Sequence, residues 1–340
     1  MKQKDLGIST VRILAMVGII VCHTVMYYQF IPQHENLGQL FNCGVGIFIF
    51  ISGLLYGANI RKSFGLNFFK KRWLRVCLPV VIWGTFVFLL DGCRNFCYWI
   101  VLLLNLQGIN FIVDNPIFNT AITGTGPLWF VTVIMLCYLM LPLLEKIRSN
   151  WSIGRIKAFV LGSWVVQVFA GLGGGVQLDY FSIFILGFFW WQLFPNYRRK
   201  ISKSKGKSIL LILIMVIVIG LRIISRHYVD GSNLYDKVIV SLTMTVFEIA
   251  FILFILGICD RQENALEKIS NTRFFRFLDT NNFYLYIVHP WFIVFTYEKI
   301  GLLPATVVFI FAINGASIAL HGCTDGLTNL IKKKRVRCEK

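Results

Sequence analysis

The chain has 340 residues, of which 56% are hydrophobic and 15% are charged, and its mean hydropathy is +0.69. Soluble domains carry about 25% charged residues, so this composition excludes an ordinary soluble protein and indicates a protein of the lipid bilayer. The formal net charge of +18 lies mainly in loops between apolar runs, which indicates membrane topology and not nucleic-acid binding.

Apolar runs follow one another along the whole sequence. They predict an all-α, polytopic bundle of about ten transmembrane helices, in a single domain over residues 1–340. The expected spans are residues 11–30, 41–60, 76–91, 128–144, 158–172, 180–195, 208–225, 238–258, 282–298 and 302–320. The basic loops between them all fall on the side of the N-terminus. The positive-inside rule therefore places both termini, with the basic tail of residues 321–340, in the cytoplasm.

Residues 96–113 are apolar enough for a further span, but a further crossing would move the later basic loops to the outside. We therefore expect residues 91–127 to form one excursion on the outer side. Irregular backbone at membrane depth is tolerated only where it is buried in protein or lines a cavity. Whether residues 96–113 are re-entrant, interfacial or spanning stays open at this point.

Two ionisable residues lie within the first apolar run, Arg12 and His23. Their eleven-residue spacing places them within about 20° of each other on one helix face and ~16 Å apart along the axis. A cation near the inner surface and an imidazole deeper in suit a ligand that binds by its charge and reacts further along. Arg12 alone is equally typical of a snorkelling anchor, whereas an intramembrane histidine favours function over packing.

The inner segment before the third span carries Lys71, Arg72 and Arg75. Arg72 and Arg75 are three residues apart, so they share a helix face. Clustered guanidinium groups form forked hydrogen bonds with phosphate oxygens. The alternative is an ordinary positive-inside segment that contacts anionic lipid.

Three further spans hold polar residues. Ser52 follows a run of large apolar residues in the second span, where a small side chain allows either close helix packing or entry of a slender ligand. Glu248 lies in mid-span, where a carboxylate needs a partner. His289 precedes Pro290, so it is either catalytic or bonded to a carbonyl that the proline leaves free.

Together these residues resemble the acyltransferase-3 family of multispanning membrane acyltransferases, which includes bacterial O-acetylases of surface polysaccharide and of peptidoglycan. Arg12 and His23 match the family's Arg-x10-His signature, and Arg72 and Arg75 match its Arg-x-x-Arg motif. Weaker blocks occur in the same order at residues 50–54, 126–130 and 284–289.

The resemblance implies a multi-pass O-acyltransferase of the bacterial plasma membrane. Its donor would be an acyl-CoA, with acetyl-CoA expected, taken from the cytoplasm. Its acceptor would be a hydroxyl of a polysaccharide, peptidoglycan or lipid-linked sugar at the outer face. We expect no metal and no permanently bound cofactor.

The spacing of the motifs agrees with this chemistry. The polyanionic CoA nucleotide would stay at the inner side, with donor-binding residues Lys71, Arg72, Arg75 and Ser52. Its thin pantetheine arm would bring the thioester to His23, which suits a general base because its ordinary pKa is near 6.5. Either Glu35 or Glu248 could orient His23. The anionic tetrahedral intermediate of acyl transfer also needs hydrogen-bond donors, and the candidates are Trp129, Tyr286, Asn281 and Asn282. His289 is a further candidate supporting residue.

A transporter or exporter of a polysaccharide or its precursor is the alternative function. Intramembrane ionisable residues and a polar outer region fit that class as well. Transporters usually show internal repeats with broken helices in matching positions, and the sequence has none. The sequence does not identify the acceptor, the acyl group or the oligomeric state.

The topology gives a first testable prediction. In a background cleared of native cysteines, a cysteine at Asn115 should react with a membrane-impermeant reagent added from outside, whereas one at Lys203 should not. Labelling is measured on intact cells and again after permeabilisation, which should expose position 203. Labelling of position 203 in intact cells would overturn the topology.

Overall fold

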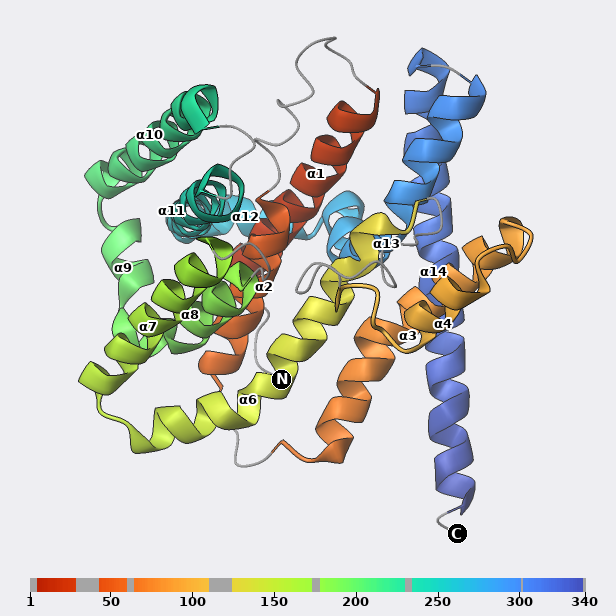
Figure 1. The fold of residues 1–340 in the computed structure, drawn as a ribbon, viewed down its shortest axis with the longest axis horizontal. Coiled ribbons are helices and arrows are strands. Elements are labelled where there is room, and N and C mark those ends of the chain that lie inside the picture. Colours follow the sequence, from red (N-terminus) through yellow and green to blue (C-terminus); the bar gives the residue numbers. More distant parts are fainter. Residues whose placement is uncertain are drawn as a thin grey trace.

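The computed structural model describes residues 5–28, 43–59, 64–109, 124–172, 178–229, 234–300 and 302–338. These residues form thirteen α-helices and contain no β-strand (Figure 1). The helices are α1 (Leu6–Tyr28), α2 (Gly44–Gly57), α3 (Leu66–Leu90), α4 (Phe96–Leu103), α6 (Trp129–Asn150), α7 (Ile153–Leu172), α8 (Asp179–Leu193), α9 (Tyr197–Ser202), α10 (Lys205–Val229), α11 (Val240–Arg261), α12 (Glu263–Ser270), α13 (Arg273–Ile300) and α14 (Leu302–Cys338). A 3-10 turn, η3 (Gly126–Leu128), precedes α6, and a π-helical turn, η4 (Leu234–Ile239), precedes α11.

Six helices of the described chain are long and apolar enough to cross a membrane. They are Leu6–Tyr27, Leu66–Leu90, Gly126–Asn150, Ile153–Leu172, Lys205–Ser225 and Val240–Arg261, and the apolar helix α2 is shorter. The protein is therefore all-α, with several helices suited to a bilayer, as the sequence predicts. The total of about ten spans and the cytoplasmic position of both termini stay predictions.

Two predicted boundaries differ from the structure. Helix α3 begins at Leu66, well before the expected span, so the basic residues preceding that span are helical. Helix α14 runs to Cys338 and includes most of the expected basic tail.

Within the predicted excursion of residues 91–127, α4 has eight residues, which are too few to cross a bilayer, and it packs against α3. Residues 110–123 lie outside the described chain, so the course of the excursion stays a prediction.

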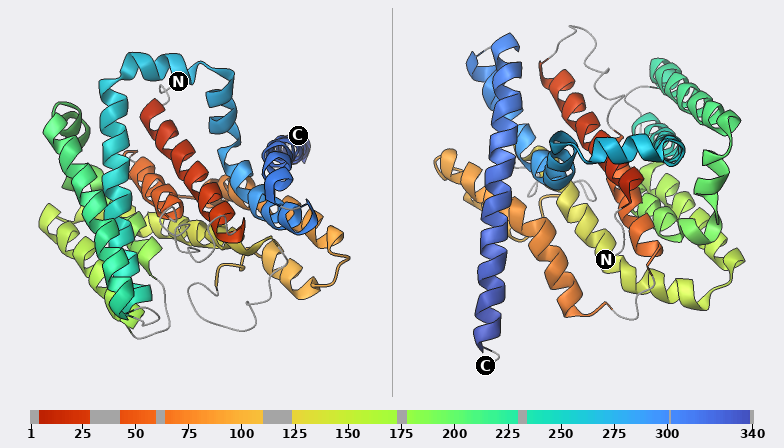
Figure 2. Two further views of the ribbon diagram at one scale, coloured as in Figure 1. Left: turned by 90° about the horizontal axis from the view of Figure 1, so that it is seen from above. Right: turned by 180° about the vertical axis from the view of Figure 1, so that it is seen from behind.

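Helix α1 lies between the two halves of the molecule (Figures 1 and 2). It packs against α13 on one side and against α2 and α11 on the other. Helices α13 and α14 pair with each other, and so do α10 and α11. Both cavities described below are lined by α1, so its position decides where the chemistry takes place.

Glycine residues allow α2 and α8 to pack backbone against backbone. A Cβ added at Gly53 would lie 2.4 Å from the carbonyl oxygen of Phe184, and one added at Gly187 would lie 2.4 Å from that of Phe50. Both distances are shorter than a Cβ contact can be, so neither position accepts a larger residue without movement of a helix. Small residues are the usual means of close helix approach in membranes.

The start of α1 is fixed by charges. Asp5 caps the helix by accepting a hydrogen bond from the backbone N–H of Ile8 at 3.1 Å. The same carboxylate pairs with Arg198 in α9, whose guanidinium also forms a forked pair with Asp260 at the end of α11. Burial alone lowers the pKa of Arg198, but the hydrogen bonds that its guanidinium donates to Asp260 and Asp5, with the charges of these carboxylates, raise it above its usual value. The network therefore stays charged and ties three helices together.

We predict that Gly53→Ala and Gly187→Ala each destabilise the protein by ~1–3 kcal/mol, because the added methyl group must push α2 away from α8. Gly220→Ala in α10 is the matched control, since a Cβ there meets no heavy atom within 4 Å. It should be neutral or slightly stabilising because alanine favours the helix. The thermal unfolding of the three detergent-solubilised variants measures the difference. Equal stability of all three would contradict the packing described.

Candidate active site

A cavity of about 440 Å³, here called the inner cavity after the predicted topology, collects three arginine side chains. They are Arg12 from α1 and Arg72 and Arg75 from α3, and the second cavity described below is called the outer cavity on the same basis. No acidic residue is among the described residues that line it, and none of the three forms an ion pair within the described chain. Three like charges around one space are unfavourable unless an anion occupies it. The arrangement therefore suits a polyanionic ligand, and it favours an anion site over a snorkelling anchor for Arg12.

Neighbouring side chains hold Arg72 in place. Its guanidinium lies over the rings of Tyr56 and Phe68, 5.2 and 5.4 Å from their centres. Such cation–π contacts fix the plane of the guanidinium and leave its N–H groups for a ligand. Ser52 and Tyr138 line the same cavity.

Asn282 of α13 closes the inner cavity next to α1. Its amide nitrogen donates to the carbonyl oxygen of Arg12 at 3.0 Å. Its side-chain oxygen has no hydrogen-bond partner in the described chain, although the residue is only 1% exposed. A ligand that carries a hydroxyl or amide N–H would satisfy this oxygen.

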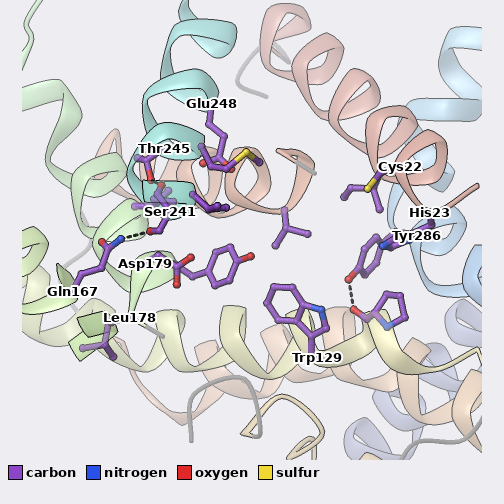
Figure 3. A pocket seen from close by; sticks show the side chains of 18 of the residues that line it. Cys22, His23, Trp129, Gln167, Leu178, Asp179, Ser241, Thr245, Glu248 and Tyr286 are labelled. Carbon is purple, nitrogen blue, oxygen red and sulfur yellow. Dashed lines mark hydrogen bonds between the residues drawn. The ribbon is translucent and has the colours of Figure 1, made fainter. Parts of the chain in front are cut away.

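An outer cavity of about 350 Å³ contains His23. Figure 3 shows this cavity with its polar residues facing one another. The polar and aromatic residues that line it are Cys22, His23, Trp129, Gln167, Asp179, Tyr180, Ser241, Thr245, Glu248 and Tyr286. The outer cavity thus differs from the inner one: it contains carboxyl, hydroxyl and amide groups, and no lysine or arginine among its described lining residues.

His23 is hydrogen-bonded to His289, because Nδ1 of His23 lies 2.8 Å from Nε2 of His289. The two rings are within 8° of parallel. Nδ1 of His289 lies 2.7 Å from the carbonyl oxygen of Tyr286, so this nitrogen must carry a proton and donate it. In a neutral ring Nε2 of His289 then accepts, and Nδ1–H of His23 donates to it. This assignment leaves the lone pair on Nε2 of His23, the form that a general base requires.

Pro290 explains why the carbonyl of Tyr286 is available. The proline lies inside α13 and has no N–H, so the carbonyl four residues earlier loses its helical partner. His289 supplies the missing donor, and the residue itself is fully buried. The His-Pro pair in the sequence therefore sets the tautomer of His289. The tautomer of His289 in turn sets that of His23.

Aromatic rings separate the two cavities. Phe130 lines the inner cavity, Tyr286 lines the outer one, and their rings meet edge to face with centres 5.4 Å apart. Phe283 stacks on the other side of Tyr286. The hydroxyl of Tyr286 donates to the carbonyl oxygen of Pro127, which fixes the ring (Figure 3). A thin chain that passes from one cavity to the other must pass beside these rings.

Some of the remaining predicted residues line one of the two cavities, and others do not. Lys71 is exposed and does not line the inner cavity. Glu35 lies outside the described residues. Glu248 and Trp129 line the outer cavity, but the side chain to which His23 is hydrogen-bonded in the described chain is His289.

Two asparagines proposed as oxyanion donors also lie away from His23. Asn281 is hydrogen-bonded to His321 at 3.1 Å, and Asn282 lines the inner cavity. Sequence analysis missed Asp179, Gln167, Ser241 and Thr245 of the outer cavity. An amide side chain is costly in lipid, so the position of Gln167 within the apolar α7 could have indicated a functional residue from the sequence.

Comparison with known proteins decides the family. The acyltransferase-3 model, described as an acyltransferase domain, matches residues 5–321. The chain belongs to the acyltransferase-3 family. This acyltransferase is therefore a membrane enzyme that moves an acyl group from a donor to an acceptor, and the transporter alternative falls away. No curated protein and no solved structure matches it.

We predict that His289→Ala lowers acyl transfer by ~10²–10⁴-fold, because His23 loses the partner that fixes its tautomer. The affinity for the acyl donor should be unchanged if the donor binds at the inner cavity, since His289 does not line it. His289→Gln should recover part of the rate, since its side-chain oxygen can accept from Nδ1–H of His23. Turnover and donor affinity of the purified variants measure the two effects. Full activity of His289→Ala would refute the role of the hydrogen bond.

Proposed function

We propose that this acyltransferase is an O-acetyltransferase of the bacterial plasma membrane. It moves an acetyl group from cytoplasmic acetyl-CoA to a hydroxyl of a cell-envelope glycan or lipid-linked sugar. The observation that carries the proposal is the pairing of two cavities along α1, one with three arginines and the other with an oriented histidine.

The inner cavity supports a CoA donor. The phosphate groups of CoA would neutralise Arg12, Arg72 and Arg75, and a guanidinium can form two hydrogen bonds with a phosphate. Ser52 and the free side-chain oxygen of Asn282 suit the amide and hydroxyl groups of the pantetheine arm. Lys71 lies at the surface beside this cavity and would contribute charge without direct contact.

The spacing along α1 supports transfer between the cavities. Eleven residues of helix separate Arg12 from His23 by ~16 Å, so a bound nucleotide can stay with the arginines while the thioester lies near the imidazole. The rings of Phe130 and Tyr286 are in contact between the cavities, so a small acyl group such as acetyl would require the least displacement of these rings. The nucleotide would not have to enter the apolar interior.

His23 performs the proton transfers in this proposal. Its Nε2 takes the proton from the acceptor hydroxyl as that oxygen attacks the thioester carbonyl. The tetrahedral intermediate then breaks its carbon–sulfur bond, and the thiolate of CoA takes the proton from the imidazolium. The products are an ester and CoA–SH, and His23 returns to its neutral form. Throughout, its Nδ1–H remains bonded to His289.

The test measures CoA affinity and acetyl transfer on the same purified variants. Arg72→Ala should weaken CoA binding about ten- to hundredfold, because it removes charge-assisted hydrogen bonds worth ~1.5–3 kcal/mol. Arg72→Lys should recover only part of the affinity, since lysine lacks the fork. His23→Gln should bind CoA normally and lose ~10²–10⁴-fold in transfer.

Lys70→Ala is the matched control, because Lys70 is exposed on the same helix and does not line the cavity. It should change neither quantity. Unchanged CoA affinity in Arg72→Ala would remove the donor site from the inner cavity. Near-normal transfer by His23→Gln would exclude His23 as the base.

A further inference from the structure

One part of the outer cavity takes no role in the proposed transfer. It lies across from His23 and is formed by α7, α8 and α11 (Figure 3). Its polar side chains are Gln167, Asp179, Ser241, Thr245 and Glu248, here called the acidic wall. Polar groups in membrane helices are costly in lipid, and five of them facing one cavity indicate a ligand.

Glu248 has a free oxygen in this wall. The residue is only 3% exposed, and its Oε2 has no hydrogen-bond partner in the described chain. Its carboxyl group occupies the space of a missing side chain, because a Cβ at Gly46 would lie 2.2 Å from both carboxyl oxygens. A buried carboxyl oxygen without a partner is unfavourable, so a ligand hydroxyl that donates to it would be bound strongly.

The neighbours of Glu248 are already fixed in position. Gln167 donates to the hydroxyl of Ser241, and the hydroxyl of Thr245 donates to the backbone carbonyl of Ser241 at 2.9 Å. The guanidinium of Arg222 contacts the sulfur of Met244, which lines the cavity, but Arg222 itself is not a lining residue. Among the described residues the wall therefore presents hydrogen-bonding groups without a lysine or arginine.

Two aromatic rings complete the surface. Trp129 and Tyr180 line the same cavity, with ring centres 5.1 Å apart. A sugar ring combines several hydroxyl groups with an apolar face, so carboxyl and amide groups beside aromatic rings match its chemistry. Because His23 lies in the same cavity, a sugar bound at this wall would have a hydroxyl within reach of the base.

We propose that the acidic wall is the acceptor subsite and that it takes an uncharged hexose residue, with Glu248 as the residue that determines this specificity. The proposal rests on the O-acyltransferase function above and names its acceptor class. A uronic acid or a phosphorylated sugar would bring a negative group beside the carboxyl groups of Glu248 and Asp179, and the described residues that line the cavity include no lysine or arginine.

The first experiment does not depend on catalysis. Ligand-observed saturation-transfer NMR is recorded on the full chain in nanodiscs with methyl glucoside, methyl galactoside, methyl mannoside and methyl glucuronide. At least one neutral hexoside should receive saturation from the wild-type protein and lose it in Glu248→Leu, which has no hydrogen-bond acceptor, while the glucuronide should receive none. Absence of transfer to every neutral hexoside, or equal transfer to the glucuronide, would overturn the proposal.

The second experiment separates acceptor binding from chemistry. With labelled acetyl-CoA and a glycan extract as acceptor, Glu248→Leu should raise the half-saturating acceptor concentration about ten- to hundredfold. Its kcat should stay within about threefold of wild type, and its CoA affinity should not change. A lower kcat with an unchanged half-saturating acceptor concentration would instead indicate that Glu248 acts through His23, and it would refute the subsite.

Thr245→Val and Thr243→Val form a matched pair two residues apart on α11. Thr245 lines the cavity, whereas Thr243 does not and bonds only to its own helix. Only Thr245→Val should weaken acceptor binding. If wild-type protein transfers no acetyl group while the hexoside still binds, the proposed function fails and the sugar subsite stands.

Discussion

A polyanion such as the CoA that we propose as donor is excluded from the apolar interior of a membrane, and the division of the molecule along α1 fits this constraint. The three arginines gather around the inner cavity, and the imidazole of His23 lies in a separate outer cavity on the same helix. In the proposed reaction, charge would be recognised at the first cavity and the proton would be transferred at the second. Only the thin arm of the donor would then have to pass between helices.

The histidine pair depends on a break in a helix. Pro290 frees the carbonyl of Tyr286, His289 donates to it, and this donation leaves His289 as an acceptor for His23. The same device in soluble hydrolases uses a carboxylate to hold the histidine. A neutral ring avoids the cost of a second buried charge, which suits a site surrounded by membrane helices.

Close helix packing holds the residues of both cavities in fixed relative positions. Gly53 and Gly187 allow α2 to contact α8 through the backbone, and α2 contributes to both cavities. The ion pairs of Arg198 with Asp5 and Asp260 fix the start of α1 against α9 and α11. A small shift of α1 would change the positions of Arg12 and His23 together, so the contacts that hold this helix matter for both cavities.

Hydropathy and helical periodicity are enough to predict the all-α membrane character, the shared helix face of Arg12 and His23, and the arginine motif in α3. The sequence also marks His289 beside Pro290 but leaves its role open.

The contacts between helices became known from the fold. His289, 266 residues from His23, is its hydrogen-bond partner, Lys71 lies outside the inner cavity, and Gln167 and Asp179 line the same cavity as Glu248. Such contacts depend on how whole helices pack, and local periodicity carries no information about which helix faces meet.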